Sequence, residues 1–294
     1  MMRGPEKTAT SIRKPDGEII TAINDFEPIS KKIKFLKWPI IRGSVNFFES
    51  MTIGVKALML SAEYYDIEEE DEKQSKFDIW VEKVFGEKLK GVVIAFSIIL
   101  SLCLSIGLFI LFPAFITNLF GIQSNSIKTL TEGAIKLIIF FGYLIGISQM
   151  KDIKRVFEYH GAEHKTIHCY ESGDELTVEN AKKHSRLHPR CGTSFLFIVL
   201  IISIVLFLAV PNSASLSWGL RSLYKIILLP LVAGLAYESI KFTGRHNNAF
   251  TRFISAPGML LQYITTKEPD EKQLEVAIAS LLAVRPEKKE TAVW

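Results

Sequence analysis

Histidines repeat along one short segment of the sequence at intervals that suit metal binding. His160, His164 and His168 follow one another every four residues, and five of the six histidines fall within the 29 residues 160–188. On a helix, a step of four residues turns by about 40°, so neighbouring members of this series share a face. Two imidazoles spaced in this way can hold one metal ion. The first and the third lie about 12 Å apart along a straight helix, which is too far to share that ion.

The same segment contains a glutamate in the spacing of a known class of metallopeptidases. His160-Gly161-Ala162-Glu163-His164 has the H-x-x-E-H order of the inverzincins. In those enzymes the two histidines hold zinc, and the glutamate handles the proton of the attacking water. Glu163 lies about 60° from His160 around a helix, so both can point into one site. We therefore expect Glu163 to be the catalytic base or a partner of a ligand.

Further ligands follow after a turn. Residues 171–174 (Glu-Ser-Gly-Asp) predict the turn, and residues 176–187 predict a second helix. If the second helix returns antiparallel to the first, His188 lies level with residue 160, and Cys191 follows three residues later. Zinc accepts such a mixture of nitrogen and sulfur. The expected ligands of a divalent metal, in the first place zinc, are His160, His164 and His188, with Cys191 as a fourth.

Other residues could replace or join these ligands. His184 could replace one of them, and His168 completes an acceptable structural zinc set of its own. That set is His164, His168, His188 and Cys191. Glu238, near the end of a later apolar segment, is either a functional acid or one half of an ion pair with Lys241. His246 emerges on the same side as the histidine segment and could approach it.

Long apolar segments must position these residues. The mean hydropathy of the chain is positive, at +0.23, although 22% of its residues are charged. Residues 92–116 contain no charged side chain. As a helix they would be about 37 Å long, enough to cross a hydrocarbon core of ~30 Å. The sequence predicts a mainly α-helical polytopic membrane protein with four transmembrane helices, at residues 92–116, 129–150, 194–210 and 223–240.

Loop charge predicts the orientation of these helices. Eight Lys and Arg residues lie between 151 and 190, whereas residues 117–128 and 211–221 contain one each. Basic loops stay in the cytoplasm, so we expect residues 151–193 and both termini on the cytoplasmic side of the plasma (inner) membrane. Cysteines in that reducing compartment are not expected to form a disulfide. The net charge of +4 gives no indication of nucleic-acid binding.

The N-terminal region predicts a β-hairpin and an amphipathic helix. Residues 8–14 and 18–24 flank Pro15-Asp16-Gly17, a strong turn signal. Residues 46–62 carry an apolar stripe at helical spacing. This helix either lies in the membrane interface or packs on the cytoplasmic domain. An acidic linker and a second amphipathic stretch follow, at residues 68–72 and 77–89.

The C-terminal region predicts two further helices. Residues 253–264 form a short apolar stretch that we expect to break at Pro257-Gly258, and a last helix is expected around residues 271–283. The expected organisation therefore has five parts. These are a cytoplasmic N-terminal region (1–90), the first two spans (91–150), a cytoplasmic helical hairpin with the histidine and cysteine motifs (151–193), the last two spans (194–241) and a cytoplasmic tail (242–294).

Three motifs resemble one known family. They are His-Gly-Ala-Glu-His-Lys (160–165), His-Pro-Arg-Cys-Gly-Thr-Ser-Phe (188–195) and Met-Met-Arg-Gly-Pro (1–5). They are similar to the YqhQ-like family of bacterial multi-pass membrane proteins, over nearly the whole chain. That family is catalogued as predicted metal-dependent enzymes of unknown function. The resemblance implies site roles for His160, Glu163, His164, His188 and Cys191, and leaves His168, Cys169 and His184 outside the motifs. Family members usually have a glycine-rich segment before the run at which this sequence begins.

These patterns favour a metal-dependent enzyme, a hydrolase, at the cytoplasmic face of the membrane. Its substrate would be a membrane-proximal peptide or lipid, with Glu163 taking a proton from water whose pKa the metal lowers toward ~7. The alternative is a scaffold or regulator in which four protein ligands enclose a structural zinc. Transport is less favoured because the predicted spans carry almost no charge, although a homo-oligomer could build a pathway. The sequence shows no glycine-rich phosphate loop, so no organic cofactor is expected.

Overall fold

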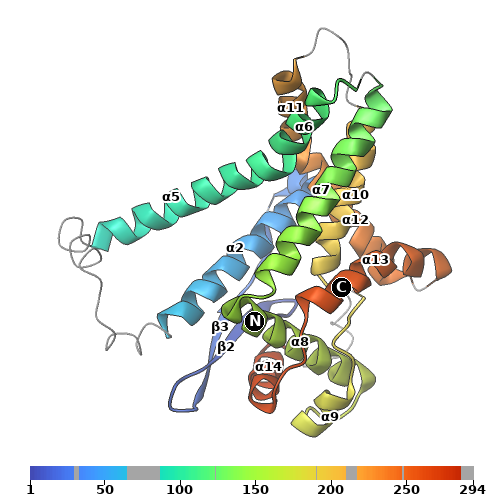
Figure 1. The fold of residues 1–294 in the computed structure, drawn as a ribbon. Helices are drawn as coiled ribbons and strands as arrows, with labels where there is room; N and C mark the ends of the chain where they lie inside the picture. The colour runs from blue at the N-terminus through green and yellow to red at the C-terminus, as the bar shows by residue number, and fades with distance from the viewer. Residues whose placement is uncertain are drawn as a thin grey trace.

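The computed structural model describes residues 1–29, 33–64, 87–122, 124–189, 191–209, 217–246 and 248–285. The fold is mainly helical, with one small antiparallel sheet near the N-terminus. Long helices run through the upper part of Figure 1, while α8, α9, α14 and the sheet gather below them. The predicted acidic linker at 68–72 and most of the predicted amphipathic stretch at 77–89 lie outside the described residues.

The sheet has three strands in the order β1-β2-β3. The strands are β1 (Met2–Arg3), β2 (Lys7–Arg13) and β3 (Ile19–Asp25). Gly17 has a positive φ of 90° in the tight turn between β2 and β3, a conformation that favours glycine. The predicted hairpin is therefore confirmed. The strand β1 was not expected, because two residues are too few to show an alternating pattern.

Among the described residues, two helices are long and apolar enough to cross a membrane, at Ala95–Leu119 and Asn125–Ile147. The first runs through α5 (Glu87–Ile106), a π-helical turn at Gly107–Leu111 and α6 (Phe112–Leu119). The second is α7 (Asn125–Ile147). Both occupy the positions predicted for the first two spans, shifted by three or four residues.

The other two predicted spans differ from long straight helices. The third is α10 (Thr193–Leu208), an apolar helix of 16 residues that rises only about 24 Å. The fourth is a pair, α11 (Trp218–Ile227) and α12 (Leu229–Arg245), bent by 41° at the break. Pro230 opens α12 without the N–H that a continuous helix would use. If the bent pair forms one span, the described residues contain three candidate spans.

The predicted amphipathic helix is α2 (Ile41–Glu63), which follows a short 3-10 helix at Lys34–Lys37 and packs along α12. The two helices approach closely at a pair of glycines, because a Cβ on Gly43 would lie 2.8 Å from the carbonyl oxygen of Gly234. Several apolar side chains of α2 remain exposed, among them Phe48, Met51 and Leu58. The helix therefore packs against one half of the bent candidate span α11–α12, and its placement in the membrane interface stays a prediction.

The remaining helices include α8, which carries the histidine series, and the helices that follow it in the chain. They are α8 (Lys151–Ser172), α9 (Val178–Lys183), α13 (Ala249–Thr265) and α14 (Glu271–Val284). The predicted break in α13 is wrong, because the helix continues through Pro257 while Gly258 packs against Ser194 of α10. The predicted last helix is confirmed as α14, which packs on α8 and β2. A Cβ on Gly161 would lie 2.1 Å from the carbonyl oxygen of Lys267, so glycine permits this close approach.

Candidate metal centre

Local sequence signals set the end of the histidine helix and the start of the helix that follows it. α8 ends at Gly173, whose positive φ of 81° lets its N–H reach the carbonyl oxygens of Cys169 and Tyr170. The chain turns, and Thr177 then caps α9 by accepting a hydrogen bond from the N–H of Asn180 at 3.3 Å. The predicted helix–turn–helix is thus present, although α9 ends at Lys183 rather than near residue 187.

The first group of metal-type donors is His160, His164 and Cys191. One donor atom from each residue lies within 4.8 Å of the others. The Nε2 atom of His160 lies 3.1 Å from the Sγ atom of Cys191. His164 and Cys191 are only 4% and 8% exposed. The structure therefore brings together three of the four predicted ligands in a buried place.

Backbone carbonyls orient the two imidazoles of this first group. The Nδ1 atom of His160 lies 2.9 Å from the carbonyl oxygen of Thr265, and that of His164 lies 2.6 Å from the carbonyl oxygen of Arg186. A carbonyl oxygen only accepts, so each Nδ1 carries the proton. Each Nε2 atom is then the donor atom for a metal. Metal-binding histidines are typically held in this way.

Cys191 and His160 form an ion pair at neutral pH. Burial raises the pKa of the Cys191 thiol, but the hydrogen bond from the His160 imidazolium outweighs it, His164 acts in the same direction, and the pKa falls to about 5. Burial lowers the pKa of His160, but the Cys191 thiolate outweighs this effect and raises it to about 9. The N–H of Thr193 also donates to Cys191 Sγ, at 3.4 Å. A thiolate is the form of cysteine that binds metal, so this donor set fits a zinc-type ion.

A second group lies further along α8 and contains His168, Glu171 and His188. His188 Nε2 lies 3.4 Å from Glu171 Oε2, and the rings of His168 and His188 are 4.7 Å apart. The Nε2 atom of His168 donates to the carbonyl oxygen of Leu187 at 2.9 Å. Burial is the largest cause that lowers the pKa of His168, which favours its neutral form.

His188 is therefore placed differently from the expected register. It lies level with His168 rather than with His160, because the chain leaves the helical path after Lys183 and crosses α8 irregularly. Gln262 of α13 holds the main chain of His188 from both sides. Its Oε1 accepts from the His188 N–H, and its Nε2 donates to the His188 carbonyl oxygen, both at 2.8 Å.

Glu163 and His184 lie outside these two groups. The Oε1 atom of Glu163 lies 2.5 Å from the amine of Met1, so the carboxylate is turned toward the N-terminal strand. His184 joins a third group with Cys169 and Asp174, and its Nε2 lies 2.9 Å from Asp174 Oδ2. Burial raises the pKa of the Cys169 thiol, which keeps it protonated and a poor metal ligand.

Glu238 and His246 belong to none of the three donor groups. Both carboxylate oxygens of Glu238 accept from the Nη2 atom of Arg42 on α2, at 2.6 and 2.8 Å. His246 is exposed at the end of α12, and its ring stacks on Phe242 with centroids 4.6 Å apart. The structure thus gives Glu238 an ion-pair partner from another helix and leaves His246 at the surface.

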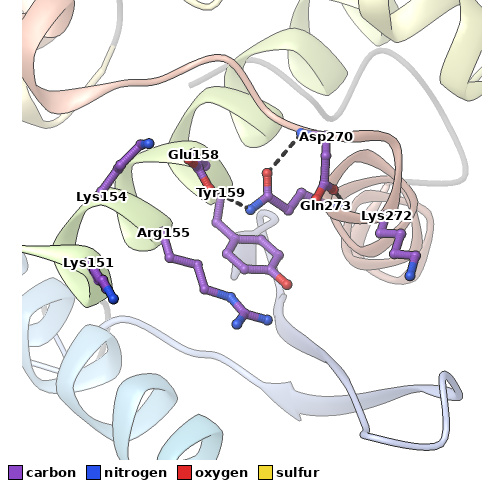
Figure 2. Close-up of a pocket in the computed structure, with 8 residues that line it drawn as sticks. All are labelled: Lys151, Lys154, Arg155, Glu158, Tyr159, Asp270, Lys272 and Gln273. Atoms are coloured by element: carbon purple, nitrogen blue, oxygen red, sulfur yellow. Dashed lines mark hydrogen bonds between the residues drawn. The ribbon is translucent and has the colours of Figure 1, made fainter.

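A basic pocket lies between the first turns of α8 and the start of α14. It has a volume of about 420 Å³, and Figure 2 shows its polar side chains. Glu158 accepts from the Nε2 atom of Gln273 at 2.9 Å across the pocket. The sequence analysis missed it because α14 follows more than a hundred residues later. The lining residues are Lys151, Lys154, Arg155, Glu158, Tyr159, Asp270, Lys272 and Gln273.

A buried charge cluster also escaped the sequence analysis. It joins α7 to α11, where Glu132 Oε2 contacts Lys225 Nζ and where Arg221 donates to Thr129 Oγ1 at 2.9 Å. Every charged member is at most 8% exposed. The sequence places Glu132, Lys136 and Lys225 near the ends of two predicted spans, and the structure buries them against one another. The charged members are Lys128, Glu132, Lys136, Arg221 and Lys225.

Comparison with known proteins gives the family. A family model described as "Protein of unknown function (DUF1385)" matches residues 38–287. The sequence is also 34% identical over 288 residues to "Uncharacterized protein YqhQ" of Bacillus subtilis (strain 168), covering 95% of this chain and 87% of that protein. No solved structure matches. The chain belongs to the DUF1385 family, and the expected resemblance to the YqhQ-like proteins is confirmed.

Proposed function

We propose that this chain is a metal-dependent enzyme, a hydrolase, that works at the cytoplasmic face of the plasma membrane. The observation that carries the proposal is the donor set of His160, His164 and Cys191, whose donor atoms lie within 4.8 Å of one another. Three protein ligands leave one position of a tetrahedral ion open, which is typical of catalytic zinc sites.

The chain's own residues prepare this site in two ways. The carbonyl oxygens of Thr265 and Arg186 fix the tautomers of His160 and His164, so both Nε2 atoms face the shared point. Cys191 supplies a thiolate, and the imidazolium proton of His160 leaves when the ring becomes a ligand. A divalent ion held there supplies Lewis-acid activation of water and of a carbonyl or phosphoryl oxygen.

Glu163 is the proposed proton acceptor. It precedes His164 on α8 and is a partly exposed carboxylate. In the structure its Oε1 meets the amine of Met1, so this role requires the side chain to turn toward the donor atoms. A Glu163→Gln variant removes the basic oxygen and nothing from the donor set. It should keep its metal and lose hydrolytic activity.

The position of the site supports a membrane-proximal substrate. α8 begins four residues after α7 ends, and Cys191 lies two residues before α10 begins. We propose four spans, with α10 as the third and the bent pair α11–α12 as the fourth. Under the positive-inside rule, the basic segment after α7 and both termini face the cytoplasm. A peptide or lipid at the bilayer surface would then reach the donor set directly.

The alternative function is a membrane scaffold with a structural zinc. One contact favours it, because the ring of His188 lies 5.7 Å from that of His164 and could supply a fourth protein ligand. Four protein ligands would close the site and leave no place for a substrate. The coordination number of the bound metal separates the two functions.

Metal analysis of the purified full-length chain tests the proposal. We expect about one equivalent of zinc or more in the wild type, and a loss of at least one equivalent in His164→Ala. His246→Ala is the matched control, because His246 is exposed and outside the donor groups. Absence of bound metal from the wild type after incubation with zinc would refute a metal-dependent function.

A further inference from the structure

We propose that His168, Glu171 and His188 bind a second divalent metal ion beside the first. One donor atom from each of these residues lies within 4.8 Å of the others. Two of the three residues, His168 and Glu171, lie outside the motifs that suggested the first site. The second site therefore follows from the packing of the chain rather than from the motif residues alone.

The donor chemistry suits a borderline transition ion. Two imidazole nitrogens and one carboxylate oxygen form a common ligand set for zinc and for iron(II). The Nε2 atom of His168 bonds to the carbonyl oxygen of Leu187 at 2.9 Å, so Nδ1 is its donor atom. His168 and Glu171 are three residues apart, a spacing that places both on one face of α8.

The position of His188 is fixed before any ion binds. Gln262 holds the N–H and the carbonyl oxygen of His188, and the His188 side chain is only 7% exposed. A rigid donor loses little freedom on binding. The His188 ring lies 4.7 Å from the ring of His168 and 5.7 Å from that of His164. Within the second group, His188 is therefore a member whose ring also lies near the first group.

Two neighbouring ions would extend the proposed hydrolase function. A joint role for the two metal sites rests on that proposed function. Pairs of metal ions clamp both oxygens of a displacement reaction in many hydrolases. His164 and His168 are one helical turn apart, so each site uses one of two successive imidazoles of α8. Without a second ion, the contact between Glu171 and His188 is simply a hydrogen bond between two side chains. The number of ions bound per chain decides between a hydrogen-bonded pair and a second metal site.

Titration of the metal-free full-length protein with Co²⁺ in detergent tests this proposal. Wild type should bind two equivalents, and the first site should show thiolate-to-cobalt absorption because Cys191 is its ligand. Glu171→Gln and His168→Ala should each weaken binding of one equivalent at least about tenfold. Both variants should keep the thiolate absorption. Cys191→Ser should lose that absorption and retain the second equivalent.

The third donor group offers a matched control. His184→Ala removes a partly exposed histidine that pairs with Asp174, and it should leave both equivalents bound. One equivalent in the wild type, with thiolate absorption and unchanged by Glu171→Gln, would overturn the second site and leave the proposed function intact. Failure to bind any Co²⁺ would overturn both. Glu171→Gln preserves size at an exposed position, so its result holds even if His168→Ala misfolds.

Discussion

The candidate metal centre on α8 and the buried charge cluster between α7 and α11 use polar side chains in opposite ways. In the charge cluster the carboxylate of Glu132 is used by partners within the protein, since it meets Lys225 and accepts from Thr117 Oγ1 at 3.2 Å. In the candidate metal centre, one nitrogen of each imidazole of the first group donates to a carbonyl oxygen, and the other nitrogen is left for a ligand. We therefore expect the charge cluster to contribute to stability and the histidine group to contribute to metal binding.

This difference predicts separate consequences for stability and for metal binding. Loss of one partner in a closed network leaves an uncompensated buried charge, whereas loss of a metal ligand removes a bound ion. Variants in the two regions should therefore be distinguishable by two measurements, the free energy of unfolding and the metal content.

The largest expected effect on stability is at Glu132. Replacement by Gln leaves the buried charge of Lys225 without its carboxylate and should destabilise the protein by about 3–5 kcal/mol. Thermal unfolding in detergent measures the change. Metal content per folded chain should stay at the wild-type level. A loss below about 1 kcal/mol would show that the cluster does not hold the helices together.

Removal of the bound metal should have the next largest effect. Zinc at 100 times its dissociation constant adds about 2.7 kcal/mol to the stability of a protein that binds it only when folded. A chelator should therefore lower the melting temperature of the wild type. It should lower the melting temperature of His164→Ala by a smaller amount, because that variant has already lost the ion held by His160, His164 and Cys191. Equal shifts in both proteins would contradict the role of His164.

The metal-free protein should show a pH window set by Cys191 and His160. The lowered pKa of Cys191 stabilises the fold above the pKa of a free thiol, and this contribution is lost as the pH falls through about 5. The raised pKa of His160 stabilises the fold below about 6.5, and this contribution is lost as the pH rises through about 9. Ultraviolet thiolate absorbance should titrate near pH 5 in the wild type and be absent there in Cys191→Ser. A midpoint near that of an ordinary thiol would exclude the ion pair.

The smallest effect is expected at the ion pair between Arg42 and Glu238. Both side chains are partly exposed, at 28% and 26%, so solvent screens their attraction. Glu238→Gln should cost about 1 kcal/mol or less and leave metal content unchanged. Chemical denaturation measures this loss. A change in bound metal would instead place Glu238 in the site.

Features encoded by neighbouring residues could be predicted from the sequence. The turn at Gly17, the cap at Thr177 and the shared face of His160 and His164 depend on spacings of a few residues. The donor group of the candidate metal centre could be predicted for this reason, because two of its three donors lie one helical turn apart on α8.

Features assembled from distant residues could not be predicted. Glu132 and Lys225 are 93 residues apart, and Gln262 holds His188 across 74 residues. The position of His188 along α8 depends on where α9 ends. The chain after Lys183 is irregular and carries no periodic sequence signal. α13 passes through Pro257 because its packing on α10 outweighs the lost hydrogen bond.

X-ray absorption of the full-length protein loaded with one equivalent of zinc tests the central claim most directly. The donor set of His160, His164 and Cys191 predicts one sulfur at about 2.3 Å and nitrogen neighbours at about 2.0–2.1 Å. The sulfur signal should vanish in Cys191→Ser. A zinc shell without sulfur in the wild type, or a failure to retain zinc, would contradict the account.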